Sequence, residues 1–189
     1  SMKLELLHIS KQYGKKTAVE DMSLVLTNGV WRISGNSKCG KTTLLRLITG
    51  SVKPTEGKIF YNERNIFEDY TQYKAVLGYL PQHFELDHVF TVKEYLNYIS
   101  AYKGLSKKQT KRRTAEALGA LRLWEVRDKK IVRLSRGMRQ RVGMAQAVLN
   151  KPKVLVLDEP SAYLDEREEN LFYELAGEFL QDRIVIITE

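Results

Sequence analysis

The stretch "ISGNSKCGKTTLL", residues 33–45, decides the fold. Within it Gly35, Gly40, Lys41 and Thr42 stand at the spacing G-x-x-x-x-G-K-[ST], which is the pattern of a phosphate-binding loop. The apolar run "VWRIS" before it predicts a strand, and "KTTLLRLITG" after it predicts a helix. That order is the context the motif requires, because the loop N–H groups and the helix N-terminus then surround an anion. The alternative is a helix N-terminus that carries two convenient glycines.

The loop also predicts which groups contact the ligand. The ammonium of Lys41 would lie beside the β- and γ-phosphates of ATP, and the hydroxyl of Thr42 would ligate Mg²⁺. The complete predicted set for nucleotide binding in this stretch is Gly35, Asn36, Ser37, Lys38, Cys39, Gly40, Lys41, Thr42 and Thr43. Cys39 is the only cysteine, which agrees with a reducing compartment.

A second stretch, "KVLVLDEP" at residues 153–160, predicts a buried strand that ends in two acids. Ligands of open α/β sheets bind at the carboxyl ends of the strands. Asp158 is suited to binding Mg²⁺, and Glu159 to acting as the base that polarises an attacking water. The alternative is a pair of acids that opens a turn before Pro160.

Strands and helices alternate at both ends of the chain, with a helical block between Gln82 and Leu134, which predicts a single α/β domain. The helix after the glycine loop is expected to stop at Gly50, and Ser106 is a plausible N-cap. Strands are predicted at residues 3–10, 22–27, 30–34, 57–62 and 183–188, and further helices at 91–104, 110–124, 136–150 and 166–180. The strand near residue 188 should lie beside the strand that carries Asp158.

The net charge of +8 permits a nucleic acid, an anionic membrane surface or a polyphosphate as partner, and equally a solvated basic surface. No apolar run approaches the roughly eighteen residues of a membrane span, so the chain is not expected to cross a membrane itself. The N-terminal residues lack a signal pattern, which favours a cytoplasmic location.

The third informative stretch, "LSRGMRQRVGMAQAVLN", lies about twenty residues before Asp158. With it the chain resembles the nucleotide-binding domain of an ATP-binding-cassette (ABC) transporter, most closely the bacterial exporter-type ATPases. The motifs fall in the family's order over essentially the whole chain: "YGKKTAVEDMSLVLTNG", "GNSKCGKTTLLRLITG", "KPTEGKI", "GYLPQ", "LSRGMRQRVGMAQAVL", "VLVLDEPSAYLD" and "VIITE".

The resemblance implies an α/β fold with a P-loop NTPase core, an N-terminal antiparallel β-subdomain and an inserted α-helical subdomain. We therefore expect one ABC-type ATP-binding domain over residues 1–189. Residues 1–85 and 140–189 would form the core with its β-subdomain. Residues 86–139 would form the helical subdomain, which carries the family's signature motif, here the stretch that begins "LSRG". We also expect the C-terminal part of the family domain to be absent.

The resemblance also assigns roles by position. Tyr13 would stack on adenine, and Gln82 would sense Mg²⁺ and the γ-phosphate and join the core to the helical block. Ser135 and Gly137 would reach the γ-phosphate held by a second subunit, and Asp165 would contact the opposite phosphate loop. Alternatively, Tyr13 is an exposed aromatic at a strand end and Gln82 a solvated polar residue.

Four positions depart from the family pattern. Lys38 and Arg136 stand where glycine is usual, and Tyr163 stands where small residues are common. A positive φ at Lys38 would cost of order 1 kcal/mol. Glu189 stands where the family has a histidine, so we expect MgATP to be bound but slowly hydrolysed. The alternative is that Glu189 is a frayed residue pointing into solvent.

The function that the resemblance implies is an ATPase subunit that dimerises over two MgATP and drives a separate integral membrane permease. The stretch "HFELDHVFTVKEYLNYI" would line part of the docking groove. The partners would be that permease and a second nucleotide-binding domain, identical or not, at the inner face of the cell membrane, with no specific nucleic acid. The alternatives are a soluble ABC-type ATPase acting on nucleic acid or ribosomes, and a regulatory module that binds ATP but hardly hydrolyses it.

Overall fold

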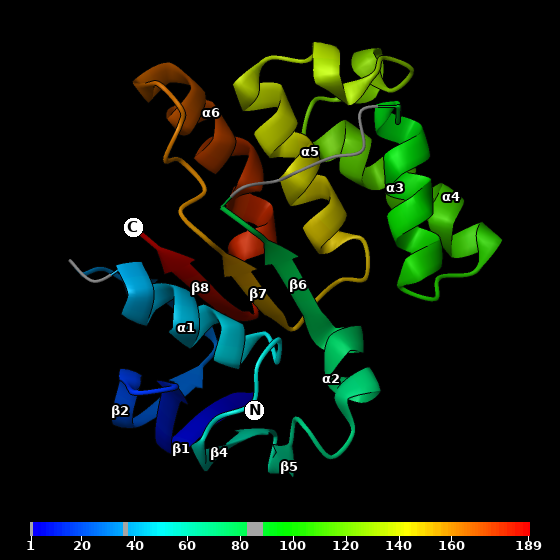
Figure 1. Cartoon of the computed structure of the whole chain (residues 1–189). Coiled ribbons are helices and arrows are strands. Elements are labelled where there is room, and N and C mark those ends of the chain that lie inside the picture. The colour runs from blue at the N-terminus through cyan, green and yellow to red at the C-terminus, as the bar shows by residue number, and fades with distance from the viewer. Residues whose placement is uncertain (1, 36–37, 83–88) are drawn as a thin grey trace.

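The computed structural model describes residues 2–35, 38–82 and 89–189, which form two four-stranded sheets and the helices around them (Figure 1). One sheet is antiparallel, with the strand order β2 (Lys16–Thr27), β1 (Lys3–Tyr13), β4 (Glu56–Tyr61) and β5 (Arg64–Asn65). The other is parallel, with the order β3 (Gly29–Ile33), β8 (Ile184–Thr188), β7 (Val154–Leu157) and β6 (Leu77–Leu80).

The helices of the described residues connect and cover these sheets. None of them is long and apolar enough to cross a membrane. The α-helices are α1 (Lys38–Ile48), α2 (Tyr70–Val76), α3 (Val92–Tyr102), α4 (Lys107–Ala120), α5 (Arg136–Val148) and α6 (Glu166–Ala176). The short 3₁₀ helices are η1 (Trp124–Val126), η2 (Ile131–Arg133) and η3 (Gly177–Leu180).

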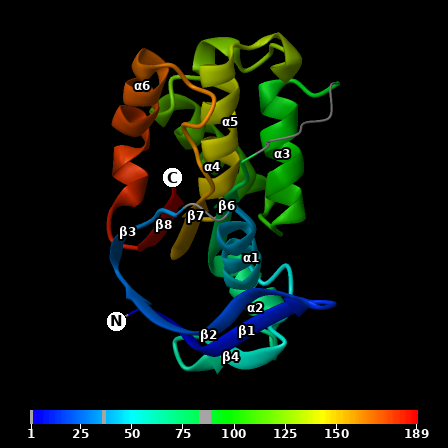
Figure 2. The ribbon, with the colours of Figure 1, turned by 60° about the vertical axis from the view of Figure 1, so that its left-hand side comes forward.

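The parallel sheet separates two hydrophobic cores. In β7, Val154 and Val156 belong to the core that contains the leucines of α1 and the antiparallel sheet, whereas Leu155 and Leu157 belong to the core formed with helices α3 to α6. The turned view shows α1 between the two sheets, with α3, α4, α5 and α6 beyond the parallel sheet (Figure 2). Burial on both faces explains why this strand is a continuous apolar run.

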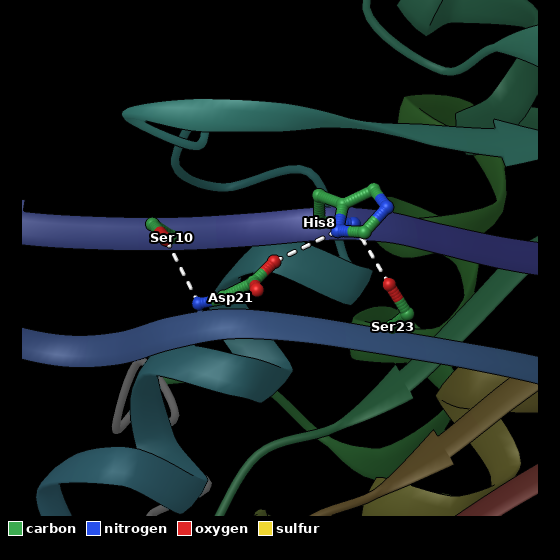
Figure 3. A network of polar contacts seen from close by, with 4 residues as sticks. All are labelled: His8, Ser10, Asp21 and Ser23. Carbon is green, nitrogen blue, oxygen red and sulfur yellow. Dashed lines mark hydrogen bonds and ion pairs between the residues drawn. The ribbon is translucent and has the colours of Figure 1, made fainter.

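The antiparallel sheet is bent by irregularities in its two longest strands. His8 in β1 and Asp21 in β2 have positive φ angles of 50° and 41°, close to shifts in the pairing register. Serine hydroxyls accept the backbone N–H groups there, from His8 to Ser23 at 3.0 Å and from Asp21 to Ser10 at 2.9 Å (Figure 3). Bulges of this kind increase the local twist, which suits a sheet that wraps around a helix.

The predicted fold class is confirmed, and the predicted strands and helices are present with ends shifted by a few residues. Gly50 ends α1 with a φ of +76°, and Ser106 caps α4 through the N–H of Gln109 at 3.1 Å. Strand β8 lies beside β7, as expected from the sequence. Strands β5 and β6 and helix α2 were not predicted from the sequence. The predicted division at residue 139 falls inside α5 and stays a prediction.

Gly78 in β6 is a position where the packing leaves no room for a side chain. An added Cβ would lie 2.2 Å from the backbone oxygen of Ala147 on α5 and 2.9 Å from Cγ of Pro152. We expect Gly78→Ala to lower the free energy of unfolding by about 1–3 kcal/mol, because a backbone oxygen cannot move aside cheaply. Urea denaturation measures this. Gly119→Ala is the matched control, since nothing lies within 4 Å of its added Cβ, and it should leave stability unchanged or raise it by up to about 1 kcal/mol.

Lys103, directly after α3, ties this helix to the C-terminal end of α5. Its ammonium donates to the backbone oxygen of Gln146 at 2.8 Å and to Oδ1 of Asn150 at 3.1 Å. Burial lowers the pKa of Lys103 from 10.5 to about 8. Between pH 8 and pH 10.5 the lysine is protonated in the unfolded chain and largely deprotonated in the folded chain. The contribution of Lys103 to the free energy of unfolding should therefore rise over this range by about 3 kcal/mol.

The measurement is the difference in unfolding free energy between the parent protein and Lys103→Met from pH 7 to pH 11. The difference should be constant below about pH 8 and should then shift in favour of the parent. Lys108→Met, at an exposed position of α4, should show no such trend. The prediction would be contradicted if the difference in unfolding free energy from the parent changed with pH in the same way for both variants.

Candidate functional site

Several strands end where α1 begins. Strands β3, β7 and β8 run parallel and end at Ile33, Leu157 and Thr188, so their carboxyl ends share one edge of the sheet. Helix α1 starts at Lys38, with only four residues between it and the end of β3. The N-terminus of α1 must therefore lie near this edge, as a phosphate-binding loop requires.

The two acids after β7 are linked by a threonine from β8. The hydroxyl of Thr188 donates to Oδ1 of Asp158 at 2.8 Å and accepts the backbone N–H of Glu159, also at 2.8 Å. Thr188 is 2% exposed, and the acids are half-buried. Glu159 has a φ of 43°, a left-handed conformation that is costly for a residue with a side chain and is often found at functional sites.

Lys41 reaches the same edge from α1. Its ammonium donates to the backbone oxygen of Glu189, the residue that follows Thr188. The backbone N–H of Glu189 donates to Ile33 at 3.0 Å, and its carboxylate pairs with Arg32 of β3 at 2.8 Å. The hydrogen bond between the Arg32 guanidinium and the Glu189 carboxylate raises the pKa of Arg32. Glu189 is therefore held by β3 and Lys41 rather than frayed, and its carboxylate is paired with a cation.

The predicted residues in and around the glycine loop are described only in part. Asn36 and Ser37 lie outside the described residues. Lys38 and Cys39 form the first residues of α1, so the backbone of Lys38 is helical and carries no left-handed strain. Of the remaining predicted loop and helix residues, Gly35 is exposed, Gly40, Lys41 and Thr42 are half-buried, and Thr43 is buried.

Gln82 and Tyr13 lie at the ends of other strands. Gln82 is half-buried and follows β6, whose last residue, Leu80, accepts the backbone N–H of Asp158 at 2.9 Å. Burial and the nearby charge of Asp158 raise the pKa of Tyr79 in the same strand. Tyr13 ends β1 and is 40% exposed, with the ammonium of Lys11 at 5.3 Å from its ring centroid.

The three remaining predicted residues gather at the N-termini of α5 and α6. The Ser135 hydroxyl accepts the N–H of Met138 at 3.2 Å and caps α5, while Asp165 caps α6. An N–H donated by Glu168 at 2.8 Å lowers the pKa of Asp165. A Cβ on Gly137 would lie 2.7 Å from Oε2 of Glu168. The side chains of Ser135 and Asp165 thus each have a local structural role.

A hydrogen bond joins this group to the acid-bearing strand. Nε2 of Gln140 in α5 donates to the backbone oxygen of Pro160 at 2.7 Å, directly after Glu159. Within the part of the chain that the structure describes, no group of three or more His, Cys, Asp or Glu residues could hold a metal ion. A Mg²⁺ ion that arrives with a polyphosphate needs only one or two protein ligands, and Thr42 and Asp158 remain the predicted ones.

No role was predicted from the sequence for Thr188, Arg32 or Tyr173. Thr188 bonds both acids, and the Arg32 guanidinium lies 5.8 Å from the ring centroid of Tyr173 on α6. One signal was available: a lone arginine in the apolar run "VWRI" and a threonine at the end of "IVII" are polar groups at the carboxyl ends of apolar strands.

Comparison with known proteins agrees with this geometry. The profile of the family described as "ABC transporter" matches residues 19–162. The Fe(3+) ions import ATP-binding protein FbpC 1 of Pectobacterium atrosepticum is 35% identical over 163 residues, which are 86% of this chain and 46% of that protein. The spermidine/putrescine import ATP-binding protein PotA of Bacillus cereus is 36% identical over 158 residues, which are 83% of this chain and 48% of that protein.

Solved structures give the same result. A dimeric bacterial ABC transporter cassette superposes with a TM-score of 0.85 and 25% identity, over 98% of this chain and 87% of that chain. An ATP-binding subunit of an ABC transporter gives a TM-score of 0.83 and 26% identity, over 98% and 78% of the two chains. The chain spans about half the length of the two curated relatives, both named as import proteins, and the closer resemblance to exporter-type ATPases stays a prediction.

Proposed function

Because this chain belongs to the ABC transporter family, we propose that it binds and hydrolyses ATP as the nucleotide-binding part of a transporter. It would pair with a second nucleotide-binding domain over two MgATP and would move a separate membrane permease at the inner face of the membrane. The names of the two curated relatives, both import ATP-binding proteins, support this proposal, as does the dimeric cassette among the solved structures.

The observation that carries the proposal is the convergence of Lys41, Asp158 and Glu159 on one pair of residues at the end of β8. Lys41 bonds Glu189, and the adjacent Thr188 bonds both acids. At this edge the ammonium can compensate the charge of a phosphate. The two carboxylates beside it can hold a metal ion or a water molecule.

Each predicted residue then has a defined task. The Lys41 ammonium binds the phosphates, and the Thr42 hydroxyl and the Asp158 carboxylate would hold Mg²⁺, which neutralises phosphate charge when bound. Thr188 orients Asp158 and holds the backbone of Glu159, whose carboxylate takes a proton from water. Gln82 would position that water.

The other predicted residues would act in adenine binding and in the dimer. Tyr13 is exposed at the end of β1, which suits stacking on a base. Ser135 and Asp165 are exposed at neighbouring helix N-termini, where they can approach a second subunit. The bond between Gln140 and Pro160 would connect that interface to Glu159.

The test is calorimetric titration with MgATP, followed by a phosphate-release assay and identification of the proteins that co-purify from cells. We expect saturable binding, measurable phosphate release and a co-purifying membrane protein. Co-purifying RNA or ribosomes would instead support the soluble ABC-type alternative. Tight binding without phosphate release, with or without the membrane partner, would support the regulatory alternative, and no nucleotide binding at all would overturn the proposal.

A further inference from the structure

A cavity of about 490 Å³ lies between α3, α4 and η1, apart from the residues assigned to nucleotide chemistry. Four basic side chains line it: Lys93, Lys107, Lys111 and Arg127. None of its lining residues is acidic. Within the described residues no ion pair involves the three lysines, and Arg127 has only the exposed carboxylate of Asp128, at 4.0 Å. The cavity therefore carries a positive charge that is largely uncompensated.

Apolar groups make up the rest of the cavity wall. Leu118 is 1% exposed and belongs to the core between the helices and the parallel sheet, and Leu105 packs against that core. Trp124 is 46% exposed and contributes an aromatic face. An apolar surface beside several cations is suited to a ligand with an apolar body and an anionic group.

The walls are held in place by short-range contacts. The backbone N–H of Lys93 donates to the oxygen of Arg127 at 2.9 Å, which fastens the segment after η1 to the first turn of α3. The Arg127 guanidinium donates to the oxygen of Trp124 at 2.8 Å and lies 4.2 Å from its ring centroid. Thr114 also lines the cavity, is 4% exposed, and has a hydroxyl without a hydrogen-bond partner among the described residues.

We propose that this α3–α4 cavity binds a small amphipathic anion, such as a medium-chain carboxylate or an aromatic sulfonate. The anionic group would lie among Lys107, Lys111 and Arg127, and the apolar body against Leu118 and Trp124. The size favours a small molecule: ligand pockets span roughly 300–1,000 Å³. A docked protein segment would instead bury about 800 Å² on each side of a standard interface.

The probe is 1-anilinonaphthalene-8-sulfonate, titrated while its fluorescence is recorded and then displaced with decanoate. We expect saturable binding at one site, displacement by decanoate, and at least tenfold weaker displacement by decanol, which has a similar apolar body and no charge. The double variant Lys107→Glu/Lys111→Glu should weaken binding of the probe at least tenfold. Ala101→Phe, which fills the cavity without changing its charge, should also abolish binding.

The matched control is Lys108→Glu/Arg112→Glu. It makes the same charge change on exposed residues of the same helix that do not line the cavity, so affinity should change less than twofold. Equal weakening by both double variants would overturn the proposal in favour of general attraction to a basic surface, and unsaturable binding would overturn it outright. MgATP affinity should be unchanged in the cavity variants, so this test is independent of the proposed nucleotide site.

Discussion

Replacing Glu159 with glutamine should lower the rate of ATP hydrolysis about 100-fold or more while leaving ATP bound. Glutamine keeps the shape of the side chain but cannot take a proton from water, and general bases typically contribute factors of about 10²–10⁴. The backbone N–H of Glu159 is held by Thr188, so the substituted side chain should occupy the same place. Phosphate release measures the loss, and gel filtration with MgATP should show a stable dimer.

Two further variants define the role of Glu159. Glu166→Gln removes an exposed carboxylate at the first position of α6 and should hydrolyse ATP at the parent rate. Asp158→Asn should weaken binding of MgATP, because this carboxylate is assigned to the metal. A Glu159→Gln protein that releases phosphate as fast as the parent would remove Glu159 from the mechanism.

Replacing Lys41 with alanine should weaken ATP binding at least tenfold. The substitution removes a charge-assisted contact to phosphate, which is typically worth about 1.5–3 kcal/mol. It also removes the hydrogen bond to the backbone of Glu189, so unfolding must be measured in parallel. Calorimetric titration with MgATP gives the affinity.

Lys108→Ala is the control for Lys41→Ala. It removes the same charge from an exposed position on α4 and should bind ATP as tightly as the parent. The decisive comparison is between two folded proteins. If Lys41→Ala is folded and its affinity equals that of the control, the loop does not bind phosphate through this lysine.

The parts of the fold that could be predicted are those with strong local patterns. The run "VLVL" of β7 is apolar because both of its faces are buried, and this pattern is present in the sequence alone. The phosphate-binding loop and helix α1 were likewise predicted from one short stretch of sequence, without reference to any contact with distant residues. The caps at Ser106 and Gly50 follow from backbone geometry within one turn.

The missed elements depend on distant contacts. Strand β6 has only four residues, including Gly78, and no periodicity distinguishes it. Its place is set by pairing with β7 and by Nε2 of Gln146, which donates to Tyr79 at 2.7 Å. Strand β5 has two residues and pairs only with β4 among the described strands. Tertiary structure, not local preference, creates such elements.

The residues of the candidate site also fall into those that local motifs predict and those that depend on distant contacts. Lys41, Asp158 and Glu159 could be predicted because each belongs to a short motif with its own chemistry. The pairing of β8 with β7, which brings Thr188 to the acids, was expected, but the pairing of β8 with β3 was not, so the role of Arg32 could not be predicted. Nothing in the sequence indicated that β3 lies beside β8, so the ion pair of Arg32 and Glu189 appears only in the structure.

The same strand order constrains how a growing chain can fold on the ribosome. Residues 29–33 of β3 pair with residues 184–188 of β8, far along the sequence, and with no other described strand. Until those late residues have been synthesised, β3 lacks its partner, and the long loop closure makes its pairing slow. The nascent polypeptide must therefore keep an unpaired strand in solution while residues 34–183 are synthesised, a state that is prone to aggregation and that chaperones recognise.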